Sequence, residues 1–440
     1  MVKNEFREYN YEVTPRVVLA DKKSKIRISS IGRNFAFDDE EYILNFIPME
    51  ITSKTVVLTS HSETMKRWNF GIYDEQIAKP VNGYLEFEYL FYGEQEWIVL
   101  VLAKANKNPA LYFHMYSLKE DLYERLPFIG DLHTHSCHSP DAKTESGNLA
   151  AEYRKIGFDF MALTDHERYY PSVELANIYK DSNTDFVFFL GEEVHLLPEI
   201  NAVHIINIGG KESINELYNT DPQKYRKEIE EYAQTLDIPE GLNKFECALR
   251  CWTSDRIREC GGISVIAHPR WRWINEYSMR AEMVEWLMAN NKYDAMELVS
   301  GLPIEDNNVQ IALYNEMRAN GIKVPIIGVS DCHGMDQQFN WGKTLAFIKD
   351  ELNVDSLRES VLNLYSVAIG YEGETPRVYG PYRLVKYAQF LLKYYFPTHD
   401  ELCVEEGIAM KNYFLGVEGA AEELKRLKGR TLEYAKRFMR

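Results

Sequence analysis

Histidine and carboxylate side chains follow short apolar stretches at five places in this 440-residue sequence. The positions that follow such stretches are His133, His135, Asp165, His166, Glu193, His268, Asp331 and His333, and His204 lies within an apolar stretch of its own. Imidazole and carboxylate groups bind zinc, manganese and iron, and a His-x-His spacing places both rings on one side of an extended segment. An isolated buried histidine is usually a hydrogen-bonded core residue, but six histidines placed in this way predict a metal centre.

From Pro127 onward, apolar segments typical of strands alternate with helical patterns. The expected strands are 158–163, 186–190, 203–208, 263–267, 295–299 and 326–329, and the expected helices lie near 144–157, 278–291 and 305–320. Continuous apolar strands that alternate with helices indicate parallel strands covered by helices on the outside. About seven such units favour a closed or nearly closed barrel, which carries its active site at the carboxyl ends of the strands.

Five short motifs resemble, in the same order, the successive motifs of the PHP (polymerase and histidinol phosphatase) family. They are His133-Thr134-His135, Thr164-Asp165-His166, Gly191-Glu192-Glu193, Ala267-His268-Pro269 and Ser330-Asp331-Cys332-His333. The resemblance covers residues 127–370 and implies a distorted seven-stranded (β/α) barrel over residues 126–370. It also implies two or three divalent metal ions, and most active members of that family hydrolyse phosphate esters.

The resemblance further implies nine metal ligands, and all nine positions are present. The expected ligands are His133, His135, Glu193 and Asp331 for the first ion, Glu193 as a bridge with His204 and His268 for the second, and Asp141, His166 and His333 for the third. Zinc, manganese and iron all suit this set of ligands.

Four residues next to the expected ligands are also titratable, and a role or an orientation is predicted for each of them. Asp131 and Asp165 are expected to orient ligand imidazoles by hydrogen bonds, as carboxylates around metal sites often do. Strand alternation sends Glu192 to the face opposite Glu193. His195 shares the face of Glu193 and either supports the ligands or has a structural role.

The expected activity is hydrolysis of a small phosphate ester by a hydroxide that bridges the metal ions. The predicted catalytic residues are the ligands Glu193 and Asp331 together with Arg168 and Arg270, which closely follow two of the ligands. An arginine donates two parallel hydrogen bonds to a phosphate. Each of these arginines is equally well explained as a surface or ion-pair residue.

Two other functions are compatible with the sequence. Some relatives of the PHP family that carry an extra β-domain cleave carbamate, amide or carboxylic ester bonds, so a metal-dependent hydrolase of a non-phosphate substrate is one alternative. A non-catalytic PHP-like binding module, as in some replicative polymerases, is the other. The complete ligand set and the lack of a polymerase region in 440 residues argue against the binding module.

Three regions lie outside the expected barrel strands. Residues 1–125 contain short stretches with strand-like alternation, among them 56–58 and 85–89, which predict an N-terminal antiparallel β-sandwich. This domain is expected to be a structural cap, with a binding surface at its sheet edge as the alternative. Residues 211–260 form a mostly helical insertion, expected either to close over the substrate as a lid with Arg270 or to pack on the barrel as an appendage. Residues 371–440 are expected to form a C-terminal helical extension.

The composition of the chain indicates where the protein is located and which partners it can bind. The formal net charge of −17 repels long nucleic acids, whereas a small anionic, phosphorylated substrate stays compatible because bound metal ions reverse the local charge. No apolar run approaches the roughly 20 residues that span a bilayer, so a cytoplasmic protein without membrane contact is expected. The six cysteines form no CxxC pair and are expected to be free thiols. The sequence carries no feature that fixes the oligomeric state.

Overall fold

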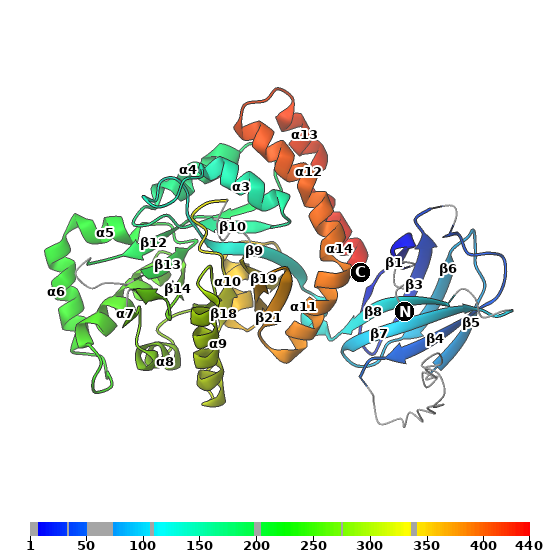
Figure 1. Ribbon diagram of the computed structural model, residues 1–440, viewed down its shortest axis with the longest axis horizontal. Helices are drawn as coiled ribbons and strands as arrows, with labels where there is room; N and C mark the ends of the chain where they lie inside the picture. The colour runs from blue at the N-terminus through cyan, green and yellow to red at the C-terminus, as the bar shows by residue number, and fades with distance from the viewer. Residues whose placement is uncertain are drawn as a thin grey trace. The chain divides into compact units, whose positions relative to one another are not determined.

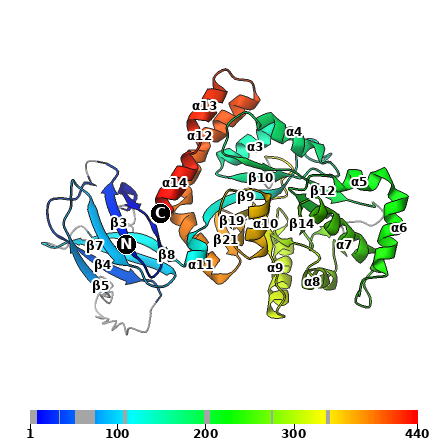
Figure 2. The same ribbon diagram turned by 180° about the vertical axis from the view of Figure 1, so that it is seen from behind.

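The computed structural model describes residues 8–32, 35–50, 74–105, 110–197, 204–273, 276–335 and 341–440. The chain forms two compact units (Figures 1 and 2), one of residues 1–126 with 432–440 and one of residues 127–431. None of the helices in these described ranges is long and apolar enough to cross a membrane. The cysteines are free.

The first unit contains two sheets that share one apolar core. The strand orders are β1 (Tyr11–Thr14), β3 (Lys23–Ser30) and β6 (Leu85–Leu90) in one sheet, and β2 (Val17–Leu19), β8 (Ala110–Leu118), β7 (Gln95–Ala103), β4 (Tyr42–Pro48) and β5 (Asp74–Ala78) in the other. Alternate burial along β7 places Trp97 and Val99 in the core, and Phe46 stacks on Tyr89 between the sheets with ring centroids 3.7 Å apart. The strand expected at 56–58 lies outside the described residues. The remaining helices here are η1 (Glu8–Asn10), α2 (Glu120–Tyr123) and the end of α14 (Arg430–Met439).

The second unit is built on two further sheets. Their strand orders are β11 (Val187–Phe189), β10 (Phe160–Leu163), β9 (Leu126–Thr134), β19 (Gly342–Ile348), β20 (Ser366–Glu372) and β21 (Thr375–Tyr379) in one, and β12 (Gly191–His195), β13 (His204–Ile208), β14 (Ile263–Ile266), β17 (Ala295–Val299) and β18 (Ile326–Gly328) in the other. Isolated parallel bridges, Thr134 with Cys332 and His166 with Glu193, connect the two sheets. A separate ribbon pairs β15 (Arg272–Trp273) with β16 (Glu276–Tyr277).

Strand direction departs from the expected parallel arrangement. β9, β10 and β11 are parallel, as are β14, β17 and β18, but β13 runs antiparallel to β12 and β14, and β20 runs antiparallel to β19 and β21. Apolar composition reports the burial of a strand and not its direction, so the sequence could not reveal this. A closed seven-stranded (β/α) barrel therefore stays a prediction, because the described strands of this unit lie in sheets of six and five strands.

Helices lie close to the ranges that the sequence patterns indicate. α3 (Ser146–Lys155), α8 (Ala281–Ala289) and α9 (Ile304–Ala319) correspond to the three expected helices, and α4 (Tyr170–Tyr179) and α10 (Val354–Leu362) add to them. Their apolar faces are buried against the strands: Leu149 and Tyr153 of α3, for example, share a core cluster with Met161 of β10. The helices thus fix the outer faces of strands whose ends carry the predicted ligands.

The insertion at 211–260 is helical, and its packing favours the expected appendage over the expected lid. Because β13 is antiparallel to β14, the chain leaves β13 at Ile208 and re-enters at Ile263, at the strand ends opposite His204 and His268. The insertion forms α5 (Ile214–Thr220), α6 (Pro222–Ala233) and α7 (Lys244–Glu259). Its apolar residues, such as Ile229 and Trp252, are buried in one cluster with Val194 and Ile205, whose side chains point away from the ligand face. The insertion is therefore a packed outer layer of the sheet.

The C-terminal helices α11 (Tyr382–Tyr394), α12 (Phe396–Phe414) and α13 (Ala420–Leu427) belong to the second unit and do not form a separate extension. α12 packs closely on α3, where a Cβ atom at Gly407 would lie 2.4 Å from the backbone nitrogen of Lys155. Only a glycine permits this approach of the two backbones. The division of the chain after residue 370 thus differs from the expected one.

A buried ionic network ties α12 to α3 and β10. The guanidinium of Arg154, which is fully buried, lies 3.0 Å from Asp159 and 2.7 Å from Glu406. Asp159 also accepts a hydrogen bond from the amide of Ile129 and contacts His399 at 2.9 Å. Burial opposes the charge of Asp159, but His399 and Arg154 hold its pKa below the ordinary value. Each buried charge therefore has a partner.

We expect the change Arg154→Met to lower the free energy of unfolding by about 3–5 kcal/mol, because it leaves Glu406 as a buried and poorly paired charge. The measurement is urea unfolding followed by far-UV circular dichroism. The neighbouring change Lys155→Met is the control. Lys155 is half-exposed and pairs with Glu152 at 3.2 Å, so its loss should cost less than about 1 kcal/mol. Equal effects of the two changes would contradict a structural role for the buried network.

Candidate metal centre

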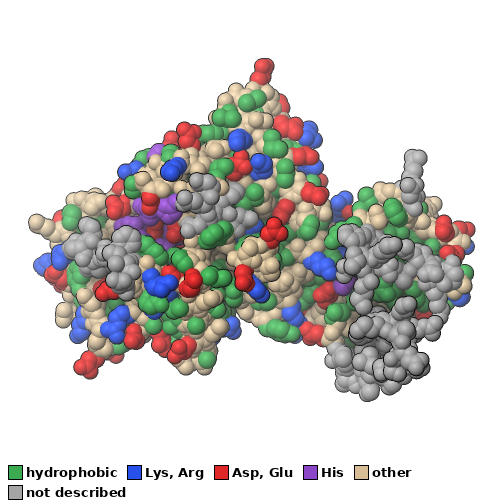
Figure 3. Space-filling model, viewed as in Figure 1, with side chains coloured by type: hydrophobic (Ala, Val, Ile, Leu, Met, Phe, Trp, Pro, Cys, Tyr) green, Lys and Arg blue, Asp and Glu red, His purple; other side chains and the backbone are tan. Residues whose placement is uncertain are grey.

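The predicted ligands are carried on strand ends of both sheets in the second unit. His133 and His135 come at the end of β9, His166 follows β10, Glu193 lies in β12, His204 begins β13, His268 follows β14, and Asp331 and His333 follow β18. Figure 3 shows histidine side chains gathered in a patch on this part of the surface. The structure brings all nine predicted positions together, since each lies within 3.6 Å of another member of the set.

Glu193 is the centre of the cluster and is fully buried. Its Oε1 atom lies 2.8 Å from Nδ1 of His204 and 3.3 Å from Nε2 of His268. Its Oε2 atom lies 3.4 Å from Nε2 of His133 and 2.7 Å from Nδ1 of His166. The two carboxylate oxygens thus face different groups of histidines, which is the arrangement that a bridging carboxylate requires.

Two further groups of atoms have the spacing of ligands around one ion. Nε2 of His133 and Nε2 of His135 are 3.0 Å apart, and they lie 3.2 and 3.1 Å from Oδ1 of Asp331. Metal–nitrogen bonds of about 2.0–2.1 Å place neighbouring ligand atoms at such separations.

The second of these groups is the set expected for the third ion. Nε2 of His166 and Nε2 of His333 are 3.3 Å apart, and both lie 3.4 Å from Oδ2 of Asp141. Asp141 is the most exposed of the nine, with 56% of its side chain accessible. This end of the cluster therefore opens to solvent.

Several buried polar atoms of the cluster have no hydrogen-bond partner. They are Oε2 of Glu193, Nδ1 of His166, His204 and His268, and Nε2 of His195. Some come within 2.7–2.8 Å of a carboxylate oxygen without the alignment of a hydrogen bond. An unsatisfied buried polar group costs about 1–3 kcal/mol, so several of them side by side indicate ligands directed at cations. Divalent metal ions fit this donor set.

Charge states in the cluster are mixed. Against the opposing effect of burial, neighbouring carboxylates raise the pKa of His133 and His268 and raise the pKa of His166 to about 9, so these three rings lose a proton when they bind a metal. Glu193, His135 and His204 already favour the form that binds a metal. Burial opposes ionisation of Glu193, but the histidines around it hold its pKa well below the ordinary carboxyl value. Burial lowers the pKa of His135 well below that of a free imidazole, and lowers that of His204 to about 4. A neutral imidazole and an ionised carboxylate are the forms that bind metals.

His195, whose role the sequence left open, belongs to the cluster. Its Nε2 atom lies 3.4 Å from Oε2 of Glu193, and its ring stacks on that of His204 with centroids 4.0 Å apart. Together with His166 and Glu193 it forms one of the groups able to hold a metal ion. Glu192, in contrast, points to the other face as expected, where Ser213 and Asn215 donate hydrogen bonds to it at 2.7 and 2.9 Å.

Glu297 is a supporting residue that the sequence analysis missed. This fully buried carboxylate in β17 lies 2.7 Å from Nδ1 of His133 and accepts a hydrogen bond at 2.7 Å from the amide of His268. It therefore fixes one ligand ring and the backbone of another. The signal was present, because Glu297 is the one charged residue in the apolar run 295–299.

The expectation that Asp131 and Asp165 orient imidazoles directly is wrong. Asp131 accepts hydrogen bonds from the amides of His133 and Ser330 and from the Tyr153 hydroxyl. Burial raises its pKa to about 6.

Asp165 accepts hydrogen bonds from Ser136 and Ser139, and the Ser139 hydroxyl is 3.2 Å from Nδ1 of His135. Both aspartates therefore hold the chain segments that carry the ligands. A strand-end position alone does not tell whether a carboxylate will face a ring or a backbone amide.

The structure does not bring Arg168 or Arg270 to the cluster. Arg168 is exposed and donates to the carbonyl oxygen of His138. Arg270 donates to the carbonyl oxygen of Met279 at 2.7 Å, and its guanidinium lies 3.7 Å from the centroid of the Tyr277 ring. The described ion pairs of Glu193, Asp331 and Asp141 are with histidines only. The backbone turns sharply after His268, which directs Arg270 to the β15–β16 ribbon.

The sequence matches no protein-family model and no curated protein. Among solved structures, it is similar to a protein from Bifidobacterium adolescentis provisionally named a metal-dependent phosphoesterase, with 17% identity, a TM-score of 0.35, and coverage of 52% of this chain and 94% of that chain. An amidohydrolase from Chromobacterium violaceum, solved with bound sulfate and no metal, has 20% identity, a TM-score of 0.32, and coverage of 47% and 88%. TM-scores this low do not establish a common fold, so membership of the PHP family stays a prediction.

We expect Glu297→Gln to weaken metal binding about 10- to 100-fold, because the amide no longer accepts both hydrogen bonds as an anion. Elemental analysis after dialysis against graded concentrations of a chelator measures this. The matched control is Glu305→Gln at an exposed position of α9, which should leave the metal content unchanged. Unchanged metal retention in Glu297→Gln would show that this carboxylate does not support the ligands.

Proposed function

We propose that this chain is a metal-dependent hydrolase of small phosphate esters. The observation that carries the proposal is the position of Glu193, whose two oxygens face separate groups of histidines. Around this carboxylate the protein offers donor atoms for more than one ion, as catalytic multinuclear centres do. A purely structural site has closed coordination, whereas here Asp141 and His333 remain partly accessible.

Divalent ions held by these residues would supply the Lewis acidity that deprotonates water near neutral pH and neutralises charge on a phosphoryl group. The protein's own part is to hold the imidazoles and carboxylates in fixed, largely buried positions, so that little rearrangement accompanies the reaction. His133, His135 and Glu193 are fully buried and set the floor of the site. The accessible side near Asp141 and His333 is where a substrate can approach.

Charge favours an anionic substrate only when the ions are bound. Three divalent ions would outweigh the carboxylates Glu193, Asp331, Asp141 and Glu297, and the loaded centre would attract a phosphate. The chain itself has a net charge of −17, which disfavours long polyanions. We therefore propose a small phosphate ester as the substrate.

A second candidate activity is the hydrolysis of a non-phosphate ester, a carbamate or an amide. The observation that favours it is the placement of Arg168 and Arg270, both of which bind main-chain carbonyl groups elsewhere. These two guanidinium groups are then not directed at the cluster, and an uncharged substrate does not need them there.

A substrate panel decides between the two candidates. The full chain is loaded separately with zinc, manganese and ferrous iron, and is assayed on phosphomonoesters, carboxylic esters, carbamates and amides. The proposal expects cleavage of phosphomonoesters that a chelator abolishes and added metal restores. Cleavage of carbamates or amides without phosphatase activity would favour the second candidate, and inactivity on the whole panel would contradict both.

We expect Glu193→Gln to lower the rate of phosphomonoester cleavage by orders of magnitude and to reduce the bound metal, because the bridging charge is lost. The measurements are kcat/KM and metal content on the same sample. Glu192→Gln is the matched control: this neighbour is equally buried but faces away from the cluster, so stability should fall and metal content should persist. Full activity and metal content in Glu193→Gln would mean that another residue forms the bridge.

A further inference from the structure

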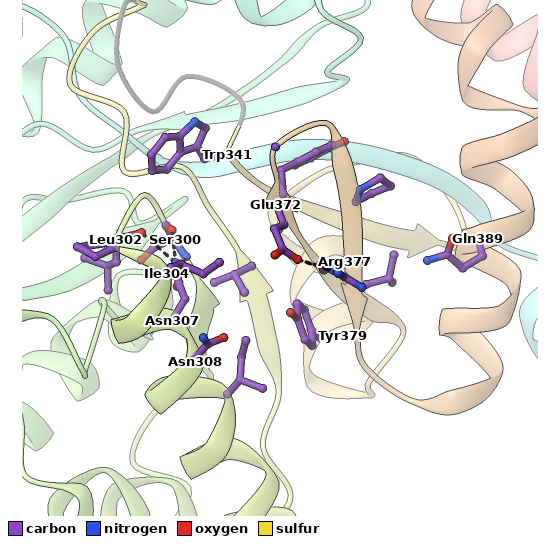
Figure 4. Close-up of a pocket in the computed structure, with 18 residues that line it drawn as sticks. Ser300, Leu302, Ile304, Asn307, Asn308, Trp341, Glu372, Arg377, Tyr379 and Gln389 are labelled. Carbon is purple, nitrogen blue, oxygen red and sulfur yellow. Dashed lines mark hydrogen bonds and ion pairs between the residues drawn. The ribbon is translucent and has the colours of Figure 1, made fainter.

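A large pocket opens in the second unit. It has a volume of about 840 Å³ and lies between the beginning of α9 and the β20–β21 hairpin, with Trp341 at its rim (Figure 4). None of the nine predicted ligands lines it. Its size is that of a small-molecule site, which typically measures about 300–1,000 Å³.

The pocket is connected to the metal centre through two neighbouring strands. In β17, Glu297 supports the ligands His133 and His268, and the same strand reaches the pocket wall at its last residue, Val299, which Ser300 follows. At about 3.3 Å per residue, Ser300 lies roughly 10 Å along the chain from Glu297.

The segment that follows β18 also connects the pocket wall with the ligands. The amide of Val329 donates to the carbonyl oxygen of Val299 at 3.0 Å, two residues before the ligand Asp331. The pocket wall and the metal centre are therefore built on the same two neighbouring segments of chain.

Ser300 supplies a polar group that the fold leaves unused. Its side chain is buried, with 3% of the residue exposed, and its Oγ atom has no hydrogen-bond partner. Asn307 fixes the backbone around it, accepting from the Ser300 amide at 3.1 Å and donating to its carbonyl at 2.9 Å. A buried hydroxyl without a partner is costly, and here it borders a pocket, so it is available to a ligand.

The character of the wall favours an uncharged ring over a second charged group. Glu372 and Arg377 pair with each other at 2.7 Å across the hairpin, so neither charge is free. The side chain of Ile311 and the ring of Trp341, which is 51% exposed, offer apolar surface. The remaining polar groups of the wall include the amides of Asn308 and Gln389. An apolar surface with a few neutral hydrogen-bonding groups is typical of sites for planar organic molecules.

We propose that this pocket binds the uncharged, ring-bearing organic group of the substrate while the phosphoryl group lies at the metal centre. This assignment rests on the proposed function. It makes Trp341 and Ser300 specificity residues, because they contact the part of the ester that does not react. The organic group gains contact with the wall, and kcat/KM rises for esters that carry a ring.

The test compares benzyl phosphate with ethyl phosphate, two phosphate monoesters of primary alcohols that differ chiefly by the ring. In the metal-loaded full chain, Trp341→Ala should lower the benzyl-to-ethyl ratio of kcat/KM about ten-fold, mainly through KM, as expected for the loss of one aromatic contact. Asn308→Trp, which fills the pocket, should lower the ratio at least as much. Tyr382→Ala, an exposed aromatic outside the pocket, is the control and should leave the ratio at the wild-type value.

Binding of benzyl alcohol, followed by saturation-transfer NMR, tests the pocket without catalysis. The signal should be present in the wild type and lost in Asn308→Trp. If the wild type cleaves neither these two esters nor any other phosphomonoester, the proposed function fails, and the NMR result alone decides whether the pocket binds a ring. An unchanged benzyl-to-ethyl ratio in both pocket variants, or benzyl alcohol bound equally by Asn308→Trp, would overturn the assignment.

Discussion

The structure of the second unit depends on one constraint, the placement of the Glu193 carboxylate in a fully buried position. A buried charge is tolerated only with partners, and the partners here are imidazoles from separate strands. β9, β10, β13 and β14 must each end or begin at this point, and the bridge between His166 and Glu193 connects the two sheets there. The position of each strand along its own axis is therefore fixed by the same carboxylate.

A second layer of buried carboxylates keeps these strand ends in place. Asp131, Asp165 and Glu297 are buried, and each accepts hydrogen bonds from backbone amides of segments that carry ligands. Asp331, which follows β18, has a backbone in the left-handed region with φ of 51°. Such a conformation persists only where the surroundings determine it. The amides that these carboxylates bind thus hold the ligands in register before any ion arrives.

How far the sequence predicts this arrangement depends on what each pattern encodes. Apolar runs followed by His, Asp or Glu predict where the strands end. Because these residue types bind metals, they also predict that the strand ends lie close together. The direction of β13 was not encoded, because Ile205, Ile206 and Ile208 are equally apolar in either direction. That one reversal moved the 211–260 insertion from the ligand face to the outer layer. The contacts of Arg270 depend on the turn after His268, which no local pattern specifies.

Exposure divides the candidate ligands into a deep set and a shallow set, and the division bears on how many ions are held. His133, His135 and Glu193 are inaccessible, whereas His333 is 22% and Asp141 56% exposed.

An ion at the deep positions exchanges its hydration shell for rigid ligands whose orientation is already fixed. An ion at the shallow positions competes with water and must order the exposed Asp141 side chain, which costs conformational entropy. We therefore expect the ion held by Asp141, His166 and His333 to bind least tightly. These three residues would also hold the ion that lies at the accessible side of the site, where a substrate could approach it. Weak binding and access to substrate thus have the same structural cause.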